Sequence, residues 1–211
     1  MNKLNQRLSN CLRNGFLITI IIVSLCSCIN IESKVSFLDD GSGSIRVKYI
    51  LPIFGEMKSK EHPLVLSLGL GEDNYHRLLE ESENLRLIEY VKKQRETNTE
   101  IIVSIGFNQI EELSEIEMFS PLKMKLISSG DKKIFSQVLY DNSNIITIEK
   151  NNNLYENIMD EATITFVIET PGNIKSANTG VIAGNQQRVE VVLPLSTFLF
   201  SSEYSYLSVD W

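Results

Sequence analysis

Few residues of this 211-residue chain have types and spacing that could support covalent chemistry. The most distinctive are Leu25-Cys26-Ser27-Cys28, where two cysteines stand at the end of an apolar run. A cysteine thiolate is a strong nucleophile and can carry a covalent modification. Small residues at the end of a short apolar run are typical of the processing site of an exported protein. The motif therefore predicts export and processing at this place in the chain.

The residues before the motif have the pattern of a signal peptide. Three basic residues and no acidic residue precede Glu32, and the ten residues Phe16–Leu25 are apolar. This length falls within the roughly 7–15 residues of a signal-peptide core, whereas a membrane-spanning helix needs about 20. The alternative is an uncleaved N-terminal anchor helix. Under both interpretations the remainder of the chain is exported.

Residues 25–28 resemble the lipobox of bacterial lipoproteins, in which a Leu stands three places before the modified Cys and a small residue stands just before it. Cys28 fits this pattern, whereas for Cys26 the small-residue position would hold Leu25. The resemblance implies that residues 1–27 are removed and that Cys28 carries a diacylglyceryl group and often an amide-linked chain such as palmitate. Each buried CH₂ contributes about 0.8 kcal/mol, so two or more chains anchor stably. We therefore expect a lipid-anchored protein of the cell membrane or outer membrane, with its domain outside the cytoplasm.

Other groups that could support catalysis are sparse. His62 precedes a proline and His76 lies on a predicted helix, and both are expected at the surface. Asp39 and Asp40 could form an acid–base pair or a calcium loop, but the spacing of calcium ligands is missing, and a plain turn is the favoured interpretation. The glutamates 111, 112, 115 and 117 are expected to be a solvated face. We expect no enzyme activity, no metal site and no cofactor, with a carboxylate-dependent hydrolase kept as a second alternative.

Composition and net charge limit the classes of molecule that this protein is expected to bind. Cleavage before Cys28 would leave 184 residues with 17 Lys and Arg against 27 Asp and Glu, a net charge of −10. Nucleic-acid binding requires clustered basic residues, so this balance argues against it. Cys11 and Cys26 would leave with the signal peptide and Cys28 would be acylated, so no disulfide is expected in the mature domain. Attachment to the membrane should depend on the lipid alone.

Alternating apolar and polar residues predict an antiparallel sheet built from hairpins. The clearest hairpin pairs 31–37 with 44–51 across the turn Asp39–Gly43. Helical spacing predicts two short helices, over 73–82 and 109–119. The further predicted strands are 85–94, 100–107, 122–127, 134–139, 162–169, 188–193 and 204–211. The expected fold class is α+β, a mainly antiparallel curved sheet with two or three short helices, in a single domain over 28–211.

Short motifs in this order resemble the LppM-like bacterial lipoproteins. They are the lipobox Cys28, the turn Asp40-Gly41-Ser42-Gly43, the segments 107–113 and 163–166, Pro171-Gly172-Asn173-Ile174, and Asn178-Thr179-Gly180. The resemblance implies an extracytoplasmic α+β domain without assigned enzymatic activity, and a glycolipid-binding role has been suggested for the mycobacterial member. Some relatives add a C-terminal membrane helix, whereas here we expect anchoring through Cys28 alone.

The sequence therefore predicts a membrane-anchored lipoprotein with a non-enzymatic domain that binds a lipid or glycolipid. The alternative is an envelope protein that docks or assembles another protein.

Overall fold

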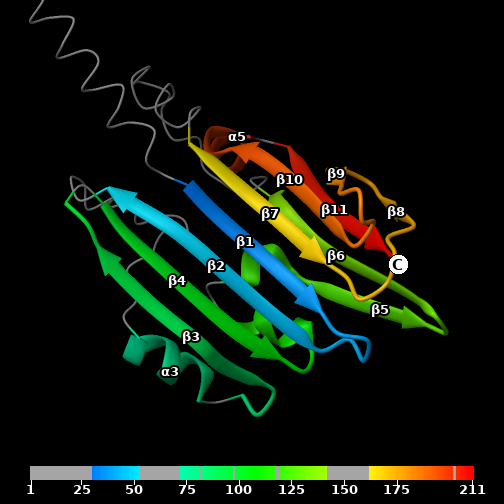
Figure 1. Ribbon diagram of the computed structural model, residues 1–211, viewed down its shortest axis with the longest axis horizontal. Coiled ribbons are helices and arrows are strands. Elements are labelled where there is room, and N and C mark those ends of the chain that lie inside the picture. The colour runs from blue at the N-terminus through cyan, green and yellow to red at the C-terminus, as the bar shows by residue number, and fades with distance from the viewer. Residues whose placement is uncertain are drawn as a thin grey trace, which may run out of the picture.

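The computed structural model describes residues 30–52, 72–80, 82–96, 98–116, 119–141, 162–201 and 203–211. Within them, two β-sheets share one apolar core (Figure 1). Sheet A has the order β3-β4-β2-β1-β7-β10-β9, and sheet B the order β5-β6-β11-β8. The strands are β1 (Asn30–Phe37), β2 (Gly43–Pro52), β3 (Leu85–Gln94), β4 (Asn98–Phe107), β5 (Lys125–Ser129), β6 (Lys132–Asp141), β7 (Thr163–Glu169), β8 (Ser176–Ala177), β9 (Val181–Ile182), β10 (Arg188–Pro194) and β11 (Tyr204–Asp210).

The predicted α+β fold class is confirmed, with one difference in strand direction. β1 pairs antiparallel with β2, so that Val35 lies opposite Ile45, but it pairs parallel with β7, where Val35 lies opposite Ile168. Sheet A is therefore mixed. Hairpin patterns show only antiparallel neighbours, because a parallel pair needs a long crossover connection that local alternation does not reveal.

Sheet B covers part of the inner face of sheet A. Its strands β6 and β11 turn Phe135, Leu207 and Val209 into the core, each fully buried. The two-residue strands β8 and β9 follow each other in the chain, and they pair with β11 of sheet B and β10 of sheet A respectively. The segment from β8 to β9 therefore connects the edges of the two sheets on one side.

Short helices cover the rest of the inner face. The predicted helix over 73–82 is confirmed as α3 (Glu72–Leu79), which packs against β3. The predicted helix over 109–119 is instead two 3₁₀ helices, η1 (Ile110–Glu115) and η2 (Ser120–Leu122). The apolar pair Ile110 and Leu113 is three residues apart, a spacing that a 3₁₀ turn places on one face as well as an α-helix does. The helix α5 (Leu195–Phe200) was not predicted.

The two ends of the strands have different characters. At one end the Phe37 ring lies 5.2 Å from the rings of Phe135 and Trp211 and 5.8 Å from that of Phe107, and we call this the aromatic end. Figure 1 shows β1 and β11 running in the same direction toward it. Asn30 and Tyr204, the first residues of these two strands, therefore lie at the opposite end of the molecule. We call this the leading end; β2 and β10 end there.

The turn at the aromatic end explains one of the sequence motifs. Asp40 Oδ1 accepts hydrogen bonds from the Ser42 amide at 2.9 Å and from its hydroxyl at 2.6 Å, and these bonds lower the pKa of the Asp40 carboxyl. Gly41 has a φ of 93°, which favours glycine, and a Cβ at position 43 would overlap the Ser36 carbonyl oxygen. The motif is thus a turn, as predicted, and its glycines are required by the backbone.

Candidate functional site

The predicted modification site lies outside the described residues. It consists of Leu25, Cys26, Ser27 and Cys28, and His62 is also outside them. The structure does fix the start of β1 at Asn30, which is paired with Ile50 on one side and Thr163 on the other. Cys28 therefore precedes, by two residues in the sequence, a strand that is paired on both sides.

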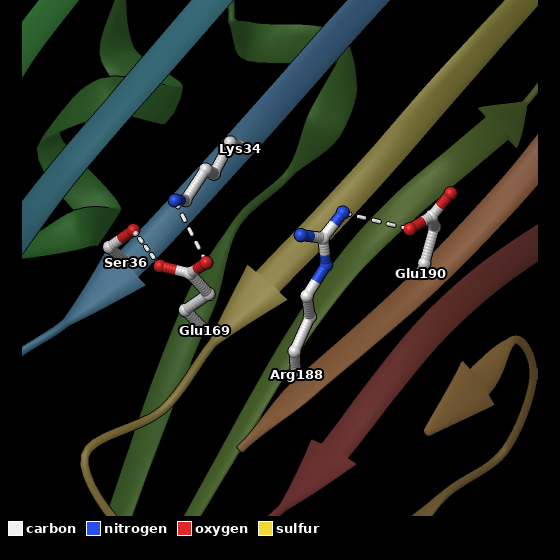
Figure 2. A network of polar contacts seen from close by, with 5 residues as sticks. All are labelled: Lys34, Ser36, Glu169, Arg188 and Glu190. Carbon is white, nitrogen blue, oxygen red and sulfur yellow. Dashed lines mark hydrogen bonds and ion pairs between the residues drawn. The ribbon is translucent and has the colours of Figure 1, made fainter. Parts of the chain in front are cut away.

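The outer face of sheet A carries a network of charged side chains, part of which is drawn in Figure 2. Glu169 of β7 accepts a 3.1 Å hydrogen bond from the Ser36 hydroxyl and pairs with Lys34 at 2.8 Å, so that it bridges two positions on β1. On β10, Arg188 pairs with Glu190 at 2.8 Å. These pairs cross the parallel β1–β7 contact and continue onto β10.

A second group of ion pairs lies on the other half of the same face. Glu100 of β4 lies 3.1 Å from Lys48 and 3.0 Å from Arg95, and the hydrogen bond with Lys48 is the main cause of the lowered pKa of this carboxyl. Arg46 lies 3.8 Å from Glu89. The Glu100 side chain is only 11% exposed, whereas both members of the Arg46–Glu89 pair are in contact with water. The main consequence of these pairs is an ordered pattern of alternating charge.

These charged side chains also cover two apolar residues of the outer face. Val167 lies between Lys34 and Glu190 in the strand register, yet it is only 1% exposed. Ile102, which is paired with Lys48, is 8% exposed. Lysine and arginine keep their charge in water while their methylene stems lie on apolar surface. The charged side chains therefore shield these two residues, whereas Val192 of β10 on the same face is exposed.

Polar groups in the interior are the other unusual feature. Gln137 of β6 is 2% exposed, and neither atom of its amide has a hydrogen-bond partner among the described residues. The buried hydroxyls of Tyr49 and Tyr75 interact with each other and have no other partner there. Burial raises the pKa of both phenols, that of Tyr75 to about 12, so both remain neutral. A buried polar group without a partner costs about 1–3 kcal/mol, so the Gln137 amide is the candidate for contact with a polar ligand.

The side chains that the sequence suggested for catalysis lie in separate parts of the fold, with His76 on α3 and the Asp39–Asp40 pair in the turn between β1 and β2. His76 is exposed on α3 and lies 4.0 Å from Glu72. Among the described residues no cluster of three or more His, Cys, Asp or Glu is placed to hold a metal ion. The absence of enzyme activity stays a prediction.

The interpretation of residues 111–117 as a solvated face was wrong for its first two glutamates. Glu111 accepts a 2.7 Å hydrogen bond from the Leu126 amide at the start of β5. Glu112 accepts one from the Ser82 hydroxyl at 2.7 Å and another from the Asn84 side chain. Both carboxylates thus connect η1 to segments distant in sequence. Glu115 is exposed, as predicted, and Glu117 lies outside the described residues.

Comparison with known proteins shows a likeness of fold to a solved structure. No protein-family model matches the chain, and no curated protein matches it. Among solved structures, the NMR structure of the folded domain of Mycobacterium tuberculosis LppM is similar, at 11% sequence identity and a TM-score of 0.49, over 87% of this chain and 88% of that one. Membership of the LppM-like lipoproteins therefore stays a prediction. Among the described residues, no helix is long and apolar enough to cross a bilayer.

Proposed function

We propose that this chain is a membrane-anchored bacterial lipoprotein whose exported domain is a non-enzymatic binding module held against the bilayer. The observation that carries the proposal is the start of β1 only two residues after Cys28. A lipid on Cys28 would leave Ile29 as the only residue between the anchor and the sheet. The domain would then lie beside the headgroups, where it can take a ligand from the membrane without a flexible spacer.

The ligand that we propose is a lipid or glycolipid with hydroxyl groups. The charged outer face of sheet A does not suit an apolar molecule, whereas the buried amide of Gln137 offers unused hydrogen-bonding capacity inside an apolar core. A ligand that brings polar atoms to this amide would remove the cost of leaving it unpaired. The interior, and Gln137 in particular, is therefore our candidate for lipid recognition.

This ligand can be tested by extracting non-covalently bound lipid from the full-length protein purified from membranes. Mass spectrometry of the extract should show a lipid at close to one equivalent in the wild type and several-fold less in Gln137→Leu. The matched control is Gln187→Leu, because the Gln187 side chain, in the loop before β10, donates to the Pro171 carbonyl oxygen in the loop after β7, and its replacement should leave the lipid content unchanged. Protein that is free of bound lipid in both the wild type and the variants would exclude lipid binding.

A second candidate is an envelope protein that docks on the outer face of sheet A. The observation that favours it is the ordered charge pattern, since complementary charge gives specificity and fast association more than raw affinity. A photo-activatable residue at Val192, which is 54% exposed on this face, should capture one protein in cells. The same residue at Ile127 on β5 of sheet B, 48% exposed, should not. Equal labelling from both positions would exclude this docking face.

A further inference from the structure

Two neighbouring tyrosines stand apart from the other exposed apolar side chains of the molecule. Tyr204 and Tyr206 on β11 are 56% and 47% exposed, and their ring centroids are 6.2 Å apart. The other large apolar side chains with high exposure in the described part of the chain are aliphatic: Leu38, Ile88, Ile127, Val181, Ile182 and Val192. Single exposed aliphatic residues are ordinary on protein surfaces, but an exposed pair of aromatic rings is a more specific feature.

The pair lies at the leading end of the molecule. Tyr204 is the first residue of β11 and pairs with Asp141, the last residue of β6. At the other end of β11, Trp211 packs against Phe37, the last residue of β1. Because β1 and β11 run in the same direction from the leading end to this contact (Figure 1), Tyr204 and Asn30 lie at the same end. At about 3.3 Å per residue, the seven residues of β11 span about 23 Å and the eight of β1 about 26 Å, so this end is well separated from Trp211.

The surroundings of the pair are compatible with a lipid surface. Tyrosine combines an apolar ring with a polar hydroxyl, and it is enriched where proteins meet the membrane–water interface. Two carboxylates lie near the pair. That of Asp141 is 3.0 Å from the ammonium group of Lys123, so its negative charge is compensated, and that of Glu203, which precedes Tyr204 in the chain, is exposed to water. The pair can therefore approach headgroups without burying the charge of Asp141.

We propose that Tyr204 and Tyr206 form a second contact with the bilayer, which orients the tethered domain with its leading end at the headgroup region. This inference rests on the proposed function, because the acyl anchor at Cys28 is what brings the leading end to the membrane. One anchor fixes a point, and a second contact on another strand restricts rotation about that point. The domain would then keep the aromatic end, with Trp211, away from the lipid.

The test uses the lipidated full-length protein reconstituted into phosphatidylcholine vesicles with either plain or brominated acyl chains. Bromine quenches tryptophan near the bilayer, and the chain has one native tryptophan, Trp211, whose emission is subtracted. In Tyr206→Trp the added emission should fall about twofold in brominated vesicles, as expected for a ring at the interface. The matched control Leu38→Trp, at the aromatic end and 60% exposed in the wild type, should show no added quenching.

Flotation of the vesicles tests the anchor at Cys28, and quenching tests the tyrosine contact, so the two can fail independently. Wild-type and variant proteins should float with the vesicles, and Cys28→Ala should not. If nothing floats, the anchor is absent and the contact falls with it. If the proteins float but the added tryptophan at position 206 is unquenched, or is quenched no more than that at position 38, the tyrosine contact is wrong and the anchor stands. Should Tyr206→Trp not fold, Tyr204→Trp provides the same measurement.

Discussion

The aromatic end and the leading end of the molecule differ in how tightly their side chains are packed. At the aromatic end Phe37 contacts three other rings, the turn is held by Asp40, and the backbone leaves no space for a side chain at position 43. At the leading end β1 starts two residues after Cys28, the predicted anchor, and the side chains of Tyr204 and Tyr206 are exposed. The comparison indicates that residues important for stability and residues available for contact are separated by the length of a strand.

The largest expected effect is at the aromatic end. Phe37→Ala removes a ring that is 5% exposed and touches Phe107, Phe135 and Trp211, so it should lower the free energy of unfolding by about 3–5 kcal/mol. Leu38→Ala, at the exposed neighbouring position, should change it by less than about 0.5 kcal/mol. Denaturant unfolding measures both variants. If the two variants were equally stable, the aromatic end would not be the stabilising part of the core.

The next effect concerns the turn that closes this end. Gly43→Ala places a Cβ against the Ser36 carbonyl oxygen and 2.9 Å from Phe107 Cζ, so it should destabilise the fold by about 1–3 kcal/mol. The control is Gly184→Ala, where a Cβ would meet nothing within 4 Å. Thermal unfolding of the two variants gives the comparison. A loss of stability in Gly184→Ala as large as that in Gly43→Ala would contradict the steric explanation.

A smaller effect on the free energy of unfolding, a gain and not a loss of stability, is expected for the buried Gln137. Gln137→Leu removes a buried amide that has no partner among the described residues. Replacing such a group by an apolar one of similar size should leave the lipid-free protein equally stable or up to about 1 kcal/mol more stable. Denaturant unfolding after lipid extraction tests this. A clear loss of stability would mean that the amide is hydrogen-bonded and is not available to a ligand.

The smallest effect concerns the charged outer face and depends on pH. The bond from Lys48 lowers the pKa of Glu100 below its ordinary value of 4.5, so the folded state favours the carboxylate. That contribution is present above the ordinary pKa and is lost as the pH falls through the folded value. Glu100→Gln should therefore be slightly less stable than the wild type at pH 7, and the difference should disappear as the solution is acidified below 4.5. Exposed Glu115→Gln should show no such difference at either pH.

The sequence predicted the local structure well where one face of a strand is buried. Residues 188–193 and 204–211 alternate, and the structure places strands there. It could not show that β1 pairs parallel with β7, because that contact joins residues more than a hundred positions apart. For the same reason Glu111 was predicted to be solvated, although it binds the backbone of β5.

The candidate site could be predicted only in part. A lipobox is a local pattern, so Cys28 could be proposed from its neighbours; it lies outside the described residues and stays a prediction. The position of the tyrosine pair could not, because the alternation of 204–211 shows which residues share a face and not which end of the sandwich they occupy. That information comes from the contact between Phe37 and Trp211, on two strands far apart in sequence.

The central claim is that a lipid on Cys28 holds the leading end of this domain at a bilayer. Mass spectrometry of the N-terminal peptide of the mature protein, purified from the membranes of bacterial cells that express the full chain, tests it most directly. The account predicts a peptide that begins at Cys28 and carries a diacylglyceryl group, with or without an amide-linked chain. A peptide that runs through Cys26-Ser27-Cys28 with both thiols unmodified would contradict it.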